Sequence, residues 1–163
     1  MFRFFSSIVF AVLVVAQPVV AKPFVFGTIN GYTVVKENRK SCYATIPLLS
    51  INGVRVSFTL YLAKGGKSSL LVSYGEGRKP KKRRDRVSVK FDGAEFLSRK
   101  VKIDNSGAFK LPTKNRSETA RFFKKFAERD RMVVLLQENG DGFALELTRS
   151  NDVIKSLGNC LAA

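Results

Sequence analysis

The stretch VRVSFTLYL, residues 54–62, decides the fold. Apolar side chains occupy every second position, from Val54 through Phe58 to Leu62, and Arg, Ser, Thr and Tyr lie between them. This period of two is that of a β-strand with one face towards a core and the other towards solvent. RVSVKF, residues 86–91, alternates in the same way. The sequence therefore predicts strands with one buried and one exposed face.

Short apolar or alternating runs fill most of the remaining chain. Asn30-Gly31, a favoured hairpin dipeptide, divides the first two of these runs, and ENGDG at 138–142 separates the last two. The further predicted strands cover residues 24–29, 32–37, 42–49, 69–74, 96–104, 107–112, 132–137 and 143–148. In the last of them, Phe143, Leu145 and Leu147 are expected on the buried side.

Two segments have the periodicity of amphipathic helices. In residues 115–130, Asn115 or Ser117 is the expected N-cap, and one face gathers Phe122, Phe123, Phe126 and Ala127. In residues 150–163, Ser150 is the expected cap, and Asp152 suits the positive end of the helix. The stripe of this second helix comprises Val153, Ile154, Leu157, Cys160 and Leu161.

These elements predict one domain over residues 22–163, with no repeat and no linker within it. About eight or nine strands and two helices indicate a mainly β, or α+β, protein. The expected architecture is a small antiparallel sandwich or barrel with the helices packed on one side or end. An apolar content of 45% is too high for a disordered chain.

The first 21 residues have the pattern of a secretory signal peptide. A single charge at Arg3 precedes an apolar run, which ends in Val19-Val20-Ala21, a suitable cleavage site. A retained membrane anchor is the alternative, but Pro18 shortens a stretch already near the lower limit for spanning a bilayer. Either interpretation predicts a domain outside the cytoplasm, in the periplasm or secreted.

The chain has two cysteines, Cys42 and Cys160. An even number in an exported chain predicts one disulfide, which would join the first third of the domain to its last helix. A redox role is disfavoured, because redox cysteines usually form a close Cys-x-x-Cys pair.

The strand before SCYA and the closing GFALELTRSNDVIKSLGNC resemble small periplasmic β-proteins of α-proteobacteria, typified by the invasion-associated locus B family. The residues that carry the resemblance are Cys42, Phe143, Leu147, Ser150, Leu157 and Cys160. The chain departs from the family pattern at Tyr32, where a Trp is usual, and at Arg149, where a Gly is usual. The resemblance implies export and a role in host interaction, and it implies no reaction.

The residues needed for the commonest enzymatic sites are missing from the sequence. The chain has no histidine, which removes Ser-His-Asp and Cys-His catalysis, and two cysteines cannot form a Cys₄ zinc site. Gly66-Lys67-Ser68 mimics the end of a P-loop, but Tyr61 stands where the motif needs its first Gly, and a strand follows. NGDG, residues 139–142, lacks the spaced ligands of a calcium loop. We therefore expect no enzymatic activity and no cofactor.

Positive charge is the strongest remaining signal. The formal net charge is +16, and without Arg3 the domain keeps 28 basic and 13 acidic residues, a net of +15. GRKPKKRRDR, residues 77–86, concentrates this charge between two predicted strands. A solvated connecting loop is one interpretation, and an anion-binding loop is the other. The candidate anion-binding residues are Arg78, Lys79, Lys81, Lys82, Arg83, Arg84 and Arg86.

We expect an exported, non-enzymatic envelope or secreted protein that contacts an anionic or host partner. Lipopolysaccharide, phospholipid headgroups and acidic glycans are the anionic candidates, and a host or envelope protein is the other. Nucleic acid is disfavoured, because the chain has no recognised binding motif and is expected to be exported. The alternatives are a protein-binding module with an exposed sheet edge and a small hydrolase or inhibitor built on scattered carboxylates.

Overall fold

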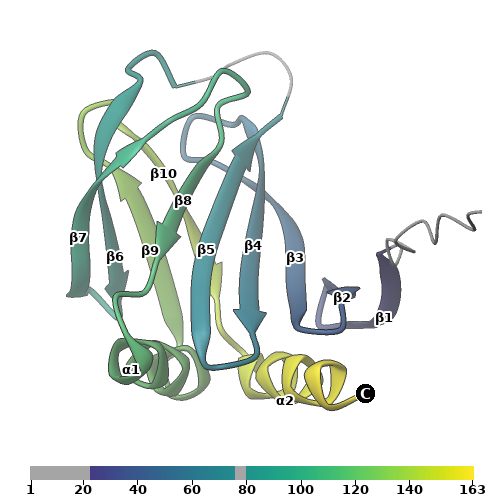
Figure 1. The fold of residues 1–163 in the computed structure, drawn as a ribbon. Helices are drawn as coiled ribbons and strands as arrows, with labels where there is room; N and C mark the ends of the chain where they lie inside the picture. Colours follow the sequence, from purple (N-terminus) through teal and green to yellow (C-terminus); the bar gives the residue numbers. More distant parts are fainter. Residues whose placement is uncertain (1–22, 76–79) are drawn as a thin grey trace, which may run out of the picture.

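The computed structural model describes residues 23–75 and 80–163, and within them it has two antiparallel sheets (Figure 1). The six-stranded sheet has the order β1 (Phe24–Ile29), β2 (Tyr32–Asn38), β3 (Ser41–Leu49), β4 (Arg55–Ala63), β5 (Lys67–Tyr74), β8 (Phe109–Pro112). The four-stranded sheet has the order β10 (Asp141–Glu146), β9 (Arg131–Leu136), β6 (Arg84–Phe91), β7 (Ala94–Lys102). The predicted signal peptide, Arg78 and Lys79 lie outside the described residues.

The mainly β prediction is confirmed. Ten strands lie in the described part of the chain, one for each of the ten predicted runs and slightly more than the eight or nine from which the architecture was inferred. The predicted turn at Asn30-Gly31 joins β1 to β2, with φ values of 49° and 79°. Asp92 and Gly93 have nearly the same geometry between β6 and β7, with φ values of 47° and 84°. Positive φ at both central residues is typical of the type I′ turns that match the twist of paired strands.

The alternating strands place their apolar side chains between the two sheets. Val56, Phe58 and Leu60 of β4 are buried, as are Val87 and Val89 of β6. Phe58 meets Phe143 of β10, with ring centroids 5.8 Å apart, so residues of both sheets interdigitate in the core. Burial of these apolar faces is the main stabilising contribution.

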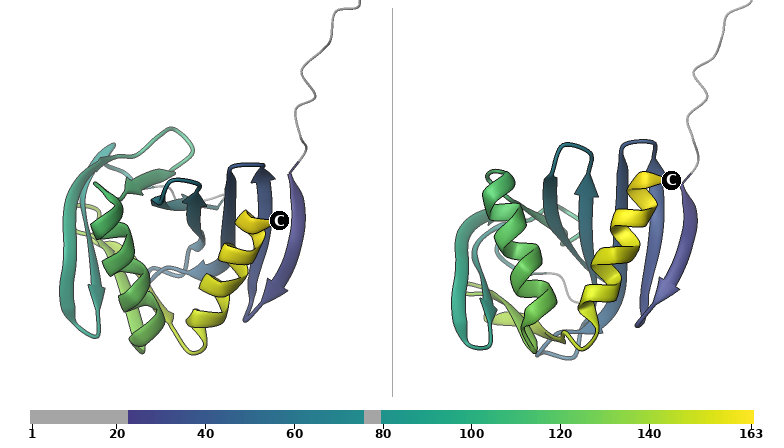
Figure 2. Two further views of the ribbon diagram at one scale, coloured as in Figure 1. Left: turned by 60° about the horizontal axis from the view of Figure 1, so that its bottom comes forward. Right: turned by 90° about the horizontal axis from the view of Figure 1, so that it is seen from below.

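Helices α1 (Arg116–Glu128) and α2 (Ser150–Ala162) lie side by side across one end of the two sheets (Figure 2). Phe122 of α1 packs 5.7 Å from Phe91 of β6 and 5.9 Å from Phe126 of the next turn, measured between ring centroids. Helix α2 contacts β1, β2 and β3 at the other side of this end. The two helices therefore close one end of the sandwich, as the sequence predicts.

The two helices begin in different ways. The Asn115 side chain accepts a hydrogen bond from the backbone N–H of Glu118 at 2.9 Å, which confirms it as the N-cap of α1. The prediction that Ser150 caps α2 is wrong. Arg149 is the N-cap residue, without a side-chain cap, and the buried Ser150 hydroxyl donates instead to the Phe126 carbonyl in the last turn of α1. That carbonyl lies near the end of α1, where main-chain acceptors need such donors.

The predicted disulfide joins Cys42 of β3 to Cys160 of α2, with the Cα atoms 6.3 Å apart. Both residues are fully buried, and 118 positions separate them in the sequence. A bridge over such a long loop restricts the unfolded chain strongly. It also holds α2 against the six-stranded sheet.

We expect the combined substitution Cys42→Ala and Cys160→Ala to lower the free energy of unfolding by about 4 kcal/mol, because the unfolded chain gains conformational freedom. Urea unfolding with and without a reductant measures this effect. Reductant should destabilise the unaltered protein and leave the double variant unchanged. An unaltered protein that is equally stable in both conditions would show that the bridge adds nothing.

Arg99 connects β7 to the other sheet and to α1. Its guanidinium group donates to the Pro112 carbonyl at the end of β8 and to the Glu118 carboxylate. Glu118 also accepts from the backbone N–H of Lys114. Burial raises the pKa of Glu118, but the hydrogen bonds from Arg99 and Lys114 outweigh it and hold the pKa below its usual value.

We expect Glu118→Gln to destabilise the protein by about 2 kcal/mol near neutral pH, because the Arg99 charge loses its partner. A carboxylate with a lowered pKa stabilises the fold above its unfolded pKa, and this contribution disappears as the pH falls through the folded pKa. The difference from the unaltered protein should therefore shrink in acid, as urea unfolding at several pH values would measure.

Glu146→Gln is the matched control for this prediction. Glu146 pairs with Arg131 at 3.5 Å, but its side chain is 74% exposed, so its loss should change stability little. Equal effects of the two substitutions at neutral pH would contradict the assigned role of Glu118.

Candidate anion-binding surface

The last three residues of the basic run are part of a strand. Strand β6 begins at Arg84, two residues before the predicted start at Arg86, so the interpretation as a connecting loop was wrong for residues 84 and 85. Lys81, Lys82 and Arg83 precede the strand and are exposed. The strand begins early because residues 84–86 continue the alternation of residues 86–91 and pair with β7.

Asp85, the one acidic residue of the run, points inward. It is 1% exposed, and its carboxylate accepts hydrogen bonds from the backbone N–H groups of Glu138 at 2.8 Å and Asn139 at 3.0 Å. The Asn139 side-chain amide donates a third bond at 2.7 Å. Asp85 thus fixes the turn between β9 and β10. Its negative charge lies on the inner side of β6, away from the outer surface.

Arg84 and Arg86 point to the opposite side, where β7 adds two more cations. Arg84 lies directly opposite Lys102, and Arg86 lies opposite Lys100. Residues opposite one another in a ladder share a face of the sheet, and all four are exposed. We call Arg84, Arg86, Lys100 and Lys102 the cationic face.

No acidic side chain neutralises the cationic face in the part of the chain that the structure describes. Other basic residues do have partners there: Lys82 lies 3.7 Å from Glu138, and Arg129 lies 3.8 Å from Asp92. Within residues 23–75 and 80–163, the four residues of the cationic face form no ion pair. Like charges directly opposite one another destabilise a sheet. The cationic face therefore has a cost in stability that an anionic ligand would remove.

The residues that precede β6 extend this surface. The Arg83 guanidinium donates to the Asn105 side chain, and its carbonyl accepts from Ile103 N–H at 2.8 Å, which ties this segment to the end of β7. Lys81 and Lys82 continue towards the turn between β9 and β10, beside Glu138. The structure thus brings five of the predicted candidates to one region: Lys81, Lys82, Arg83, Arg84 and Arg86.

Lys100 and Lys102 are the site residues that the sequence interpretation did not single out. A signal for the hairpin itself was present. The dipeptide Asp92-Gly93 is a favoured hairpin turn, and regular pairing of its flanking strands would place Arg99 opposite Arg86 and Val101 opposite Arg84. The irregular register at Val89 and Lys90 shifts the pairing by one residue and brings Lys100 and Lys102 to these positions.

The other motifs have structural roles. Residues 64–66 form the turn between β4 and β5, and Ser68 lies in a strand, so the Gly-Lys-Ser sequence belongs to a hairpin and not to a P-loop. The two most buried carboxylates, Asp85 and Glu118, are both committed to hydrogen bonds that hold the fold together. Within the described ranges, no group of three His, Cys, Asp or Glu residues is placed to hold a metal ion.

Comparison with known proteins found no matching family model, no matching curated protein and no matching solved structure. None of the helices in residues 23–75 and 80–163 has the length and apolar character needed to cross a membrane.

We expect Lys100→Gln to raise the free energy of unfolding by about 0.2–1 kcal/mol at low salt, because it removes the repulsion with Arg86. Added salt should shrink the gain, since salt screens exposed charges. Chemical unfolding at low and high salt measures both effects. Lys155→Gln, at an exposed position of α2, is the control and should change stability little. A loss of stability in Lys100→Gln would contradict the repulsion.

Proposed function

We propose that this chain is an exported, non-enzymatic envelope or secreted protein that binds an anionic polymer on its cationic face. The observation that carries the proposal is the square of four exposed cations, Arg84, Arg86, Lys100 and Lys102, with no described acidic partner. Repulsion between the opposed cations destabilises the free protein. A bound polyanion would relieve this repulsion, which would contribute to the binding free energy.

The spacing of the cationic face suits a polymer better than a single small anion. Alternate residues along a strand are about 7 Å apart, and opposite residues are about 5 Å apart. Four charges at these spacings meet several anionic groups of one chain or surface at once. The excess positive charge of the domain also draws polyanions towards it over a longer range.

Two observations support export. Residues 1–21 have the composition of a signal peptide. The Cys42–Cys160 disulfide is typical of proteins in oxidising compartments. The polyanions of such compartments are lipopolysaccharide, phospholipid headgroups and acidic glycans, and the proposed partner belongs to this group.

Membership of the invasion-associated locus B family is part of the proposal. The disulfide between the two cysteines of the resemblance supports it. So does the left-handed backbone of Arg149, with φ of 60°, at the position where Gly is usual in the family. This membership would make a host surface the source of the anionic partner.

Binding of heparin, lipopolysaccharide and anionic vesicles at physiological salt tests the proposal. We expect the combined substitution Arg84→Gln, Arg86→Gln, Lys100→Gln and Lys102→Gln to weaken binding about 100-fold or more, since each lost cation costs on the order of 1 kcal/mol. The slope of log affinity against log salt should fall by roughly three to four.

The matched control removes four cations from the helices instead, with the same change in net charge: Arg121→Gln, Lys124→Gln, Lys125→Gln and Lys155→Gln. It should keep most of the affinity. Equal losses in both variants would show that net charge alone attracts the ligand. No binding by the unaltered domain would refute the proposal, and capture of a host or envelope protein instead would favour the protein-binding alternative.

A further inference from the structure

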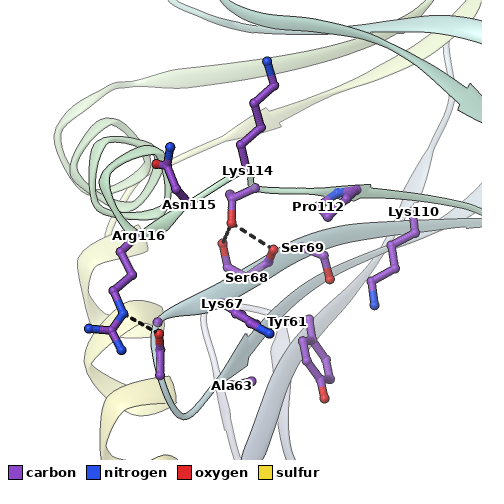
Figure 3. A pocket seen from close by; sticks show the side chains of 13 residues that line it. Tyr61, Ala63, Lys67, Ser68, Ser69, Lys110, Pro112, Lys114, Asn115 and Arg116 are labelled. Atoms are coloured by element: carbon purple, nitrogen blue, oxygen red, sulfur yellow. Dashed lines mark hydrogen bonds between the residues drawn. The ribbon is translucent and has the colours of Figure 1, made fainter.

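A groove lies on the outer face of the six-stranded sheet, where β4, β5 and β8 meet near the start of α1 (Figure 3). It has a volume of about 570 Å³. Its lining includes four basic residues and, among the described residues, no carboxylate. It lies on the opposite sheet from the cationic face, so the two surfaces are separate.

Two of the four basic side chains point into this groove. In Figure 3, the ammonium groups of Lys67 and Lys110 lie on the same side as the Ser69 hydroxyl and the Tyr61 ring. Lys114 points away, and Arg116 donates from Nε to the Gly65 carbonyl at 2.8 Å. Lys67 and Lys110 are therefore the cations available to a ligand.

Ser69 supplies a hydroxyl group to the groove. Ser69 is only 3% exposed, and it lines the groove. The hydroxyl of the neighbouring Ser68 is engaged elsewhere, because it lies 3.2 Å from that of Thr113 and 3.3 Å from that of Thr119. The Ser69 hydroxyl can donate a hydrogen bond to a ligand oxygen.

A hydrogen-bond network beside the groove orients the Tyr61 ring, which lies near Lys110. One oxygen of Glu37 accepts hydrogen bonds from the Tyr61 hydroxyl at 2.8 Å and from Ser41 at 2.7 Å. Burial raises the pKa of the Tyr61 phenol, so it stays protonated as the donor. The Tyr61 ring is thereby fixed, and the Lys110 ammonium lies 5.4 Å from its centroid.

We propose that this groove binds the phosphate group of a small molecule, with Lys67 and Lys110 balancing its charge and Ser69 donating a hydrogen bond. Two ammonium groups act as point charges, which suits the several oxygens of a phosphate. Lysine is a common phosphate ligand, and the one arginine of the groove is turned away to Gly65. The site is independent of the proposed polyanion binding.

Titration with inorganic phosphate and with glucose 6-phosphate, followed by ³¹P NMR and calorimetry, tests this inference. We expect saturable binding to the unaltered domain. It should weaken at least about tenfold, or about 1.4 kcal/mol, in the combined variant Lys67→Gln and Lys110→Gln. Ser69→Ala should weaken it in the same direction. Tighter binding of glucose 6-phosphate would indicate a phosphate ester as the ligand, and equal binding would indicate free phosphate.

The control variant, Lys100→Gln with Lys102→Gln, should bind both phosphates normally and heparin less well. The groove variant should show the reverse pattern, so that failure of either proposal is seen separately. Both groove lysines are exposed, and circular dichroism would confirm that their variant is folded. The inference is overturned if the unaltered domain shows no saturable phosphate binding, or if the groove variant binds as well as the unaltered domain.

Discussion

The bond between Cys42 and Cys160 ties the last helix to a strand near the beginning of the domain, and the closed end of the sandwich depends on it. Without α2 in place, the ends of β1, β2 and β3 would lose their cover. Ser150 at the start of α2 also satisfies a carbonyl in the last turn of α1. The bridge anchors α2, α2 meets α1 through Ser150, and Glu118 of α1 pairs with Arg99 of β7. This series of contacts runs from the bridge to both layers of the fold.

Because two packed sheets each turn one face outward, the protein has two outer surfaces that can differ in chemistry. The β6–β7 side carries Arg84, Arg86, Lys100 and Lys102 on an exposed surface. The β4–β5–β8 side has a groove with fewer charges and a buried hydroxyl at Ser69. The first suits an extended anionic surface, and the second suits a compact group. The core that separates them is apolar, so each surface can change without altering the other.

Much of the fold followed from local patterns. Residues 54–62 alternate strictly, so β4 and its buried face were predictable. Asn115 was recognisable as an N-cap, and the cysteine pair as a disulfide. These features are local in sequence or are fixed by a small number of candidates.

The features that could not be predicted depend on contacts between distant segments. Strand β8 pairs with β5 although the β6–β7 hairpin lies between them in the sequence, and this pairing places Lys110 in the same groove as Lys67. Ser150 looks like an N-cap by its place in the sequence, but the neighbouring helix supplies a competing acceptor. Half of the cationic face could be predicted from the sequence, because Arg84 and Arg86 belong to the basic run. Their partners Lys100 and Lys102 on β7 are identified only by the strand register.

The alternating charges of β6 also affect the stability of its pairing register. Arg84, Asp85, Arg86 and Val87 point alternately outward and inward, so sliding the strand by one residue would exchange the two sets of side chains. Two guanidinium groups would then enter an apolar core, and Asp85 would lose its three donors. Burying unpaired charges is very unfavourable, so the shifted register is much less stable than the native one. Arg84 and Arg86, which are proposed to bind a ligand, thus also favour the native register of the strand that carries them.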